Sequence, residues 1–283
     1  NQCRDVHEWF TYFGRHFDAP VVGIDSPKSV RHLNEAIIRD VQFQMEALVP
    51  HLERVTGEPL DKAKLSHTVE LSLLATRLWN EVLETATHSP SPLTFFDGVI
   101  HMGPIVVLRG TQEAVDYYDL LLAEMKERIR EGVAAVEGER HRLYWEGMPI
   151  WGRLRSHSEL LTGLKCATVA STYCNSWVFN DFDPSDPWRS MALAYTGIFI
   201  VRSEEAKERY IKDMVKRFSI DGIVFHDSKT CPANSNARYG MPQRLQEETG
   251  VPTLVIDGDL NDLRCVSDEQ LLTNIEAFVE GMG

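Results

Sequence analysis

The stretch Gly222-Ile223-Val224-Phe225-His226-Asp227-Ser228-Lys229-Thr230-Cys231 joins a short apolar run to a polar loop that ends in a cysteine. An apolar run of this length, bounded by polar residues, indicates a strand that is buried on both faces of a sheet. Similar runs lie at residues 143–145, 167–170 and 253–256. Helical patterns separate or follow them, at about 157–164, 191–217, 238–249 and 268–281. This alternation predicts an α/β domain at 139–283, with a doubly wound, flavodoxin-like parallel sheet covered by helices on both faces.

Residues 1–138 carry a different pattern. The run Val21-Val22-Gly23-Ile24-Asp25, followed by Ser26-Pro27, predicts a parallel strand that ends at a loop. Apolar residues then recur at helical spacing through 30–52, 65–83 and 111–136. We therefore expect the tail of a second α/β domain, followed by a helical section.

Composition limits the classes of protein that this chain can represent. The chain has 283 residues, of which 43% are hydrophobic, which is enough for one large domain or two smaller ones. A net charge of −13 argues against a general nucleic-acid binder or a protein of anionic membranes. A run of about 18 apolar residues is absent from the sequence, so we expect no membrane span.

Five cysteines lie far apart in the chain. An odd and scattered set is a poor disulfide framework, so the sequence indicates a reducing, cytoplasmic compartment. The first residue is Asn1 rather than an initiator methionine, and we expect the chain to be truncated at this end.

Polar and reactive residues gather where the predicted strands end. In open parallel sheets, ligands bind beyond the carboxyl ends of the strands. Four segments of the sequence occupy such positions, namely 145–149, 171–176, 226–231 and 257–262. We therefore expect the site along this edge of the sheet.

Three cysteines are candidate ligands for a metal centre. Cys231 lies in a loop beside Lys229 and near a helix start, which favours its thiolate, and thiolates are the usual ligands of iron–sulfur clusters. A structural cysteine in a turn is the alternative. Cys3 occupies a second strand-end loop if a strand precedes it. Cys174 ends another predicted strand, where it is either a pocket residue or a buried thiol.

His226 ends a predicted strand, where it is either a proton donor to a bound substrate or a side chain hydrogen-bonded into its loop. Cations near the strand ends could bind the phosphates of a nucleotide-like ligand or form surface salt bridges. They are Arg153, Arg155, Lys229 and Arg238. The sequence has neither a phosphate-binding G-x-x-x-x-G-K-[ST] loop nor a G-x-G-x-x-G motif after a strand, which disfavours a P-loop ATPase and a Rossmann dinucleotide site.

The sequence resembles the benzoyl-CoA reductase and 2-hydroxyacyl-CoA dehydratase family in four stretches. Two are C-terminal, at 226–244 and 249–264, and two are N-terminal, at 1–3 and 17–27. The likeness extends over essentially the whole chain. Three short elements most resemble the B-type subunit of benzoyl-CoA reductase: Lys229-Thr230-Cys231, Asn234-Ser235-Asn236 and Arg238-Tyr239-Gly240-Met241-Pro242.

The resemblance implies a [4Fe-4S] cluster that is held by three cysteines of the subunit. Cys3 and Cys231 match the second and third of these ligands. The first has no counterpart here, so the resemblance places the remaining ligand upstream of residue 1. Cys174 could take that role only if the fold differs from that of the family.

The resemblance also implies partners and a reaction. The partners are a homologous second subunit, which completes a heterodimer, and an ATP-hydrolysing iron–sulfur activator that supplies electrons of very low potential. The electrons pass to an acyl-CoA thioester. The leading expectation is reduction of benzoyl-CoA to a dienoyl-CoA, with His226 as the expected proton donor.

Three alternatives remain. The first is a 2-hydroxyacyl-CoA dehydratase subunit, in which a ketyl radical loses hydroxide. The second is a non-catalytic iron–sulfur partner subunit. The third is a metal-free, flavodoxin-like ligand-binding domain.

Overall fold

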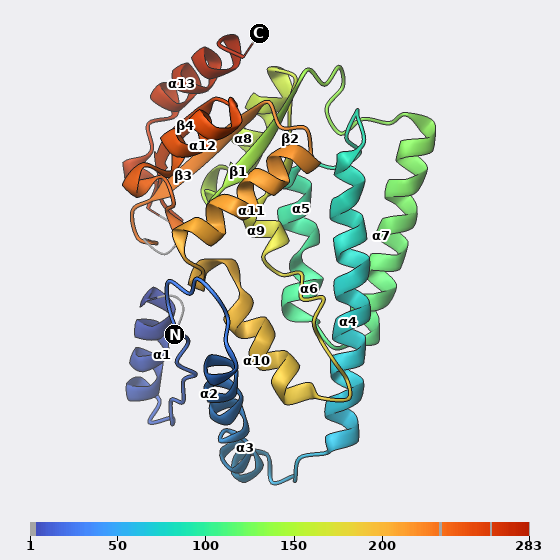
Figure 1. Ribbon diagram of the computed structural model, residues 1–283, viewed down its shortest axis with the longest axis vertical. Coiled ribbons are helices and arrows are strands. Elements are labelled where there is room, and N and C mark those ends of the chain that lie inside the picture. Colours follow the sequence, from blue (N-terminus) through green and yellow to red (C-terminus); the bar gives the residue numbers. More distant parts are fainter. Residues whose placement is uncertain (1–3, 232–233, 261, 283) are drawn as a thin grey trace.

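A four-stranded, all-parallel sheet forms the centre of the molecule (Figure 1). The computed structural model describes residues 4–231, 234–260 and 262–282. The strands follow the order β2-β1-β3-β4, which is the flavodoxin-like order and confirms the predicted α/β class. They are β1 (His141–Glu146), β2 (Cys166–Ser171), β3 (Gly222–Ser228) and β4 (Thr253–Gly258).

Both faces of the sheet are buried at β1, β2 and β3, as the apolar runs predict, while the edge strand β4 is partly exposed. Side chains of a strand alternate between faces. Leu143 and Trp145 of β1 accordingly enter one buried cluster, while Tyr144 enters a second cluster on the other face. β3 follows the same rule, because Val224 joins the first cluster and Phe225 the second.

Helices cover the two faces unequally. On the face of Tyr144, α11 and α12 supply the second cluster. On the face of Trp145, α8 and α13 are joined by helices from the first half of the chain. The four helices of the C-terminal half are α8 (Leu154–Gly163), α11 (Glu204–Arg217), α12 (Met241–Thr249) and α13 (Asp268–Glu280).

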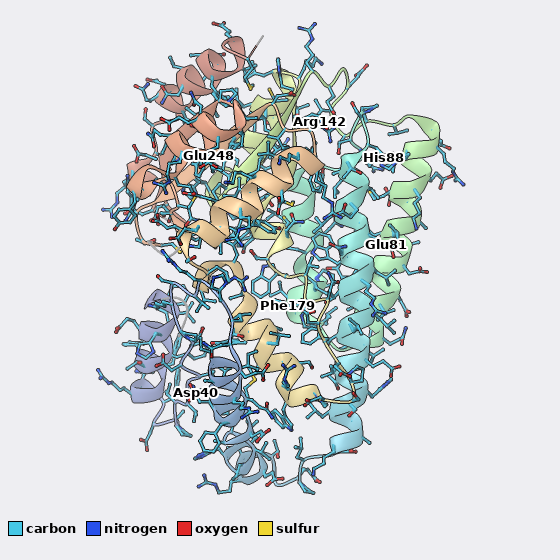
Figure 2. All side chains as sticks on the ribbon, viewed as in Figure 1. Asp40, Glu81, His88, Arg142, Phe179 and Glu248 are labelled. Atoms are coloured by element: carbon cyan, nitrogen blue, oxygen red, sulfur yellow. The ribbon has the colours of Figure 1, made fainter. Side chains whose placement is uncertain are left out.

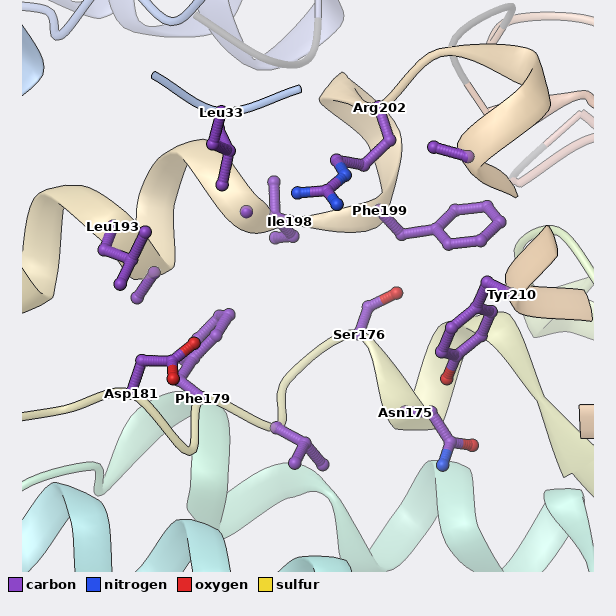
Figure 3. Close-up of a pocket in the computed structure, with 14 residues that line it drawn as sticks. Leu33, Asn175, Ser176, Phe179, Asp181, Leu193, Ile198, Phe199, Arg202 and Tyr210 are labelled. Carbon is purple, nitrogen blue, oxygen red and sulfur yellow. The ribbon is translucent and has the colours of Figure 1, made fainter. Parts of the chain in front are cut away.

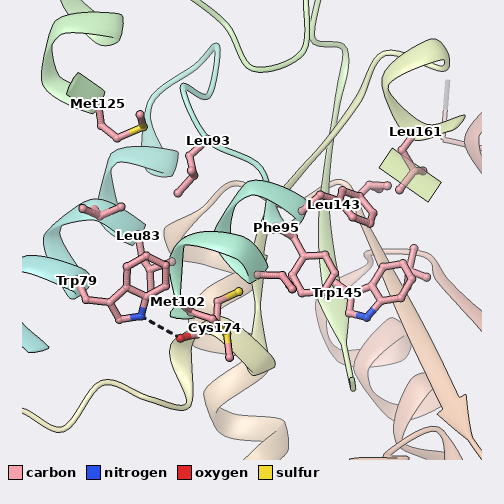
Figure 4. Packing of buried hydrophobic residues seen from close by; sticks show 14 of the residues in the cluster. Trp79, Leu83, Leu93, Phe95, Met102, Met125, Leu143, Trp145, Leu161 and Cys174 are labelled. Carbon is pink, nitrogen blue, oxygen red and sulfur yellow. Dashed lines mark hydrogen bonds between the residues drawn. The ribbon is translucent and has the colours of Figure 1, made fainter. Parts of the chain in front are cut away.

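The predicted helical section packs directly on the sheet. Figure 4 shows Phe95 stacked on Trp145, with ring centres 5.3 Å apart. One buried cluster therefore takes residues from both sides of residue 138, and a domain boundary at that position stays a prediction. The helices are α4 (Lys62–Glu84), α5 (Phe95–His101), α6 (Gly103–Val107) and α7 (Gln112–Glu131).

A smaller group of helices lies beyond the carboxyl edge of the sheet (Figure 1). Ile38 and Val41 of α2 pack against Ala192 of α10. The group comprises α1 (Arg4–His16), α2 (Glu35–Glu46), α3 (Val49–Thr56) and α10 (Pro187–Gly197). Short helical turns complete the fold at η1 (Thr85–Thr87), η2 (Trp151–Arg153), α9 (Thr172–Asn175), η3 (Phe199–Val201), η5 (Arg238–Gly240) and η6 (Leu263–Cys265).

The prediction of a strand at residues 21–25 is wrong. This segment has no regular secondary structure, and Val21 and Val22 are about half exposed. A strand needs a neighbour to complete its backbone hydrogen bonds, and the one sheet of the described residues contains only β1 to β4. Across the described part of the chain, every helix is too short or too polar to cross a bilayer.

Candidate functional site

The strand order fixes where the crevice of the sheet lies. The chain leaves β1 through α8 to reach β2, and then crosses to the opposite side of β1 to form β3. The order reverses between β1 and β3, and ligands of open α/β sheets bind at such a switch point. Glu146 ends β1, and the loop 228–236, which carries Cys231, follows β3.

A buried polar network connects the two sides of this switch point. The carboxylate of Glu146 accepts hydrogen bonds from the Thr172 hydroxyl and from Asn236 Nδ2, the latter at 2.5 Å. The Tyr144 hydroxyl lies 2.6 Å from Thr172 Oγ1, and Lys207 Nζ donates to Asn236 Oδ1 at 2.9 Å. These five residues, here called the edge network, join β1, α9, α11 and the loop after β3.

Burial sets the electrostatics of the edge network. Burial raises the pKa of Glu146 to about 6, while the hydrogen bonds from Thr172 and Asn236 and the charge of Lys207 limit the rise. Burial also lowers the pKa of Lys207, and the charge of Glu146 opposes that change. The amide of Asn236 thus joins a buried carboxylate to a buried ammonium group. Loss of one of two such buried charges lowers the stability of the fold strongly.

The loop that carries Cys231 is fixed by further hydrogen bonds. Ser235 Oγ donates to the carbonyl oxygens of Ser228 and Cys231, at 2.8 and 2.9 Å. Gly147 allows this loop to approach β1, because its φ is 101° and a Cβ there would lie 3.3 Å from the Asn234 carbonyl oxygen. Cys231 itself is half-buried, and its electrostatic interaction with Lys207 acts to raise the pKa of that lysine.

A cavity of about 260 Å³, here called the edge pocket, adjoins the network. Figure 3 shows Arg202 and Ser176 on opposite sides of the pocket, with Tyr210 and Phe199 at one end. Lys207 Nζ lies 5.4 Å from the centre of the Phe199 ring, so one side chain contacts both the edge network and a wall of the pocket.

Arg202 is the cation of the edge pocket. Within the described residues, its guanidinium forms no ion pair with a carboxylate. Sequence reasoning missed this residue because Arg202 lies in a region that reads only as helix. The four cations that the sequence did indicate are all paired in the structure: Arg153 with Asp268, Arg155 with Glu159, Arg238 with Asp227, and Lys229 with Asp227 and Asp257. The side chains are drawn in Figure 2, where Phe179, another residue of the edge pocket, is labelled.

His226 is buried beside the last strand. Its Nδ1 lies 2.6 Å from the carbonyl oxygen of Met148, and burial lowers its pKa, so the ring is neutral at neutral pH with its proton on Nδ1. Gly258 leaves space for the ring, because a Cβ at that position would lie 2.5 Å from Nε2. The hydrogen-bonded arrangement is thus the one that the structure contains, and the role of proton donor stays a prediction.

The other predicted ligands differ in their surroundings. Cys3 lies outside the described residues. Cys174 is 2% exposed within the apolar cluster, and Trp79 Nε1 donates to its carbonyl oxygen at 3.3 Å (Figure 4). Burial raises the pKa of the Cys174 thiol to about 12, which disfavours a thiolate. Across residues 4–231, 234–260 and 262–282, His, Cys, Asp and Glu do not assemble in threes around a common point, so convergence of Cys3 and Cys231 stays a prediction.

The buried His157 should make stability depend on pH. Burial lowers its pKa from 6.5 to about 4, Asp268 opposes this change, and interactions with His226 and Arg153 add to it. Between pH 6.5 and pH 4, the unfolded chain therefore binds a proton at His157 that the folded chain does not bind. The contribution of His157 to the free energy of unfolding is complete above pH 6.5 and is lost as the pH falls through 4.

The expected loss is about 3 kcal/mol of unfolding free energy. Urea unfolding of the wild type and of His157→Phe, at pH 7.5 and at pH 4, measures this difference. The variant should lack this part of the pH dependence. Equal pH dependence in the two proteins would show that His157 does not carry it.

Comparison with known proteins assigns the family. The model of the family "2-hydroxyglutaryl-CoA dehydratase, D-component" matches residues 1–282. The chain is 29% identical to the alpha subunit of (R)-2-hydroxyisocaproyl-CoA dehydratase from Clostridioides difficile, over 100% of this chain and 69% of that protein. It is 27% identical to the alpha subunit of (R)-2-hydroxyglutaryl-CoA dehydratase from Acidaminococcus fermentans, over 100% of this chain and 59% of that protein.

A third relative has a different reaction in its name. The B-type subunit of benzoyl-CoA reductase from Thauera aromatica is 28% identical, over 98% of this chain and 68% of that protein. The named relatives are subunits of enzymes, and the resemblance expected from the sequence is confirmed. This chain belongs to the 2-hydroxyglutaryl-CoA dehydratase D-component family.

Proposed function

We propose that this chain is the iron–sulfur subunit of a low-potential acyl-CoA enzyme, and that its reaction is the reduction of benzoyl-CoA to a dienoyl-CoA. One observation carries the proposal. Lys207 connects the loop of Cys231, through Asn236, to the Phe199 wall of the edge pocket. A metal centre held by Cys231 would therefore lie close to a ligand in that pocket.

The size of the edge pocket supports an acyl group as the ligand. A cavity of about 150 Å³ binds benzene, so 260 Å³ accepts one ring or a short branched chain. Sites that bury a larger ligand measure roughly 300–1,000 Å³, so the coenzyme A portion would lie outside. Phe179, Phe199 and Tyr210 give the pocket aromatic walls, which suit a benzoyl ring.

The residues at the switch point fit a cluster ligand. Cys231 is half-buried and interacts electrostatically with Lys207, and a cation in the surroundings favours a thiolate. We propose Cys231 and Cys3 as two of the ligands of the cluster. When bound, the cluster supplies transfer of single electrons at low potential. The edge network holds the loop of Cys231, and Arg202 would stabilise negative charge on the acyl thioester.

The remaining parts of the proposal concern partners. We propose a homologous second subunit and an ATP-dependent iron–sulfur activator as the source of electrons. The relatives named above are alpha or B-type subunits, which supports a multi-subunit enzyme. A second candidate reaction is the removal of water from a 2-hydroxyacyl-CoA, which the family description and the dehydratase relatives favour.

The full-length complex, prepared without oxygen and supplied with activator, ATP and reductant, tests the proposal. Benzoyl-CoA should be consumed only when ATP is present. Dehydration of (R)-2-hydroxyacyl-CoA with benzoyl-CoA untouched would establish the second candidate instead. Turnover of neither substrate would overturn both reactions.

Arg202→Leu should lower kcat/KM for the acyl-CoA substrate about a hundredfold, the loss that accompanies removal of one group that stabilises developing charge. Arg155→Leu is the matched control, because the side chain of Arg155 is 91% exposed and pairs only with Glu159 among the described residues. Equal activity in the two variants would contradict a role for Arg202 in the pocket.

A further inference from the structure

One wall of the edge pocket comes from a segment that has almost no regular structure. Residues 176–182 form the first part of the connection from α9 to α10, as turns and backbone without regular structure. Ser176, Val178, Phe179 and Asp181 of this segment line the pocket. An irregular segment keeps a fixed position only when contacts from elsewhere hold it.

The side chain of Arg109 provides such contacts. Arg109 follows α6, and its Nη1 donates to Thr76 Oγ1 of α4 at 2.8 Å. Its Nη2 donates to the carbonyl oxygen of Trp177 at 2.7 Å. The guanidinium carbon also lies 4.8 Å from the centre of the Phe179 ring and 5.6 Å from that of Phe182. One side chain thus ties the pocket wall to the helical section.

The arrangement depends on the shape of the guanidinium as well as its charge. Within the described residues, Arg109 forms no ion pair with a carboxylate, and its neighbours are a hydroxyl, a carbonyl and two rings. Burial lowers its pKa to about 10, so the group is still cationic at neutral pH. A planar fork can donate in two directions and stack on an aromatic ring at once, whereas an ammonium group cannot.

We propose that Arg109 is a positioning residue that holds Phe179 in the wall of the edge pocket and thereby sets its preference for compact acyl groups. The inference rests on the proposed function, because it takes the edge pocket as the acyl site. Figure 3 shows Phe179 facing the α10 side of the pocket, where Leu193 and Ile198 lie. Without Arg109, the 176–182 segment can move away from α10, and the pocket can then accept longer chains.

Arg109→Met tests the inference, since methionine keeps much of the length but removes the charge and both hydrogen bonds. The full-length complex is used without oxygen, and binding of benzoyl-CoA and of octanoyl-CoA is measured by calorimetry. Benzoyl-CoA should bind about tenfold more weakly to the variant, a typical effect of altered pocket contacts. Octanoyl-CoA should bind equally well or more tightly.

Hydrogen exchange gives a second readout that does not need acyl-CoA. Peptides covering 176–186 should exchange faster in Arg109→Met, while those of α4 and of the strands stay protected. Arg109→Lys keeps the charge but loses the planar fork, so its exchange rate at 176–186 should lie between those of the wild type and Arg109→Met. If Arg109→Met does not fold, Arg109→Lys alone tests whether Arg109 holds this segment. Arg155→Met, on an exposed and separate helix face, should match the wild type.

The failure of this inference differs from the failure of the proposed function. Unchanged exchange at 176–186 and unchanged selectivity in both Arg109 variants would overturn the role of Arg109. A wild-type complex that binds neither acyl-CoA would overturn the proposed function, whatever the exchange data show.

Discussion

Serine in place of Cys231 should remove most of the iron and acid-labile sulfide that this subunit contributes to the complex purified without oxygen. Even loss of a group that only orients a metal ligand costs about 10–100-fold in affinity, so loss of a ligand sulfur should leave this subunit with little of its iron. The hydroxyl is a poor thiolate substitute, because serine is not ionised at neutral pH. Iron, sulfide and the paramagnetic resonance signal of the reduced protein would be measured together.

Cys265→Ser is the matched control for this experiment. Cys265 is also a half-buried loop thiol, but its Sγ lies 3.0 Å from the carbonyl oxygen of Asp262, outside the edge network. That variant should keep the iron content of the wild type. Equal iron in both variants would remove Cys231 from the ligand set and, with it, the proposed electron path.

Alanine in place of Glu146 should lower the free energy of unfolding by about 3–5 kcal/mol. The substitution removes the carboxylate whose charge most opposes the burial of Lys207, with Glu204 as the other nearby acid, and leaves the amide donor of Asn236 without its acceptor. Removal of one partner from a buried pair typically has a cost of this size. Urea unfolding monitored by circular dichroism at pH 7.5 measures the loss.

Glu159→Ala serves as its control, because Glu159 is an exposed acid whose loss should change stability by no more than about 0.5 kcal/mol. Glu146→Gln should be milder than Glu146→Ala, since its amide oxygen still accepts a hydrogen bond from Asn236. A loss under about 1 kcal/mol in Glu146→Ala would contradict the energetic importance of the network.

The pKa of Glu146 adds a pH signature to the same variants. Its value in the folded chain is raised from 4.5 to about 6. The stabilising effect of this shift is therefore complete below pH 4.5 and is lost as the pH rises through 6. Glu146→Gln cannot ionise, so its stability relative to the wild type should improve by about 2 kcal/mol between pH 4.5 and pH 7.5.

Sequence patterns predicted all four strands because β1, β2 and β3 are buried on both faces and the edge strand β4 keeps an apolar run. Such strands must be apolar throughout, and this requirement appears as short runs that end in polar residues. The same logic failed at Val21–Asp25, whose local composition is equally strand-like. A run of residues specifies an extended backbone, but only a neighbouring strand turns that backbone into part of a sheet.

The candidate site was predicted in part. Cys231 lies in the strand-end loop that the sequence indicated, and Glu146 and Thr172 lie in strand-end segments that it also singled out. Lys207 and Arg202 gave no signal, because a cation within a helical pattern normally faces solvent. Their importance arises from tertiary contacts, because Lys207 meets Asn236 and Arg202 lines the edge pocket.

By itself, the sequence determined the class of fold and the family, and it predicted a site at the carboxyl edge of the sheet. These properties depend on local periodicity and on short motifs, which neighbouring residues encode together. Only the tertiary structure decided that Glu146 meets Asn236 across 90 residues of chain, and that Arg109 reaches Trp177 across 68. Such meetings depend on the order of strands and on helix packing, because they join segments whose separation in sequence carries no information about their distance in space.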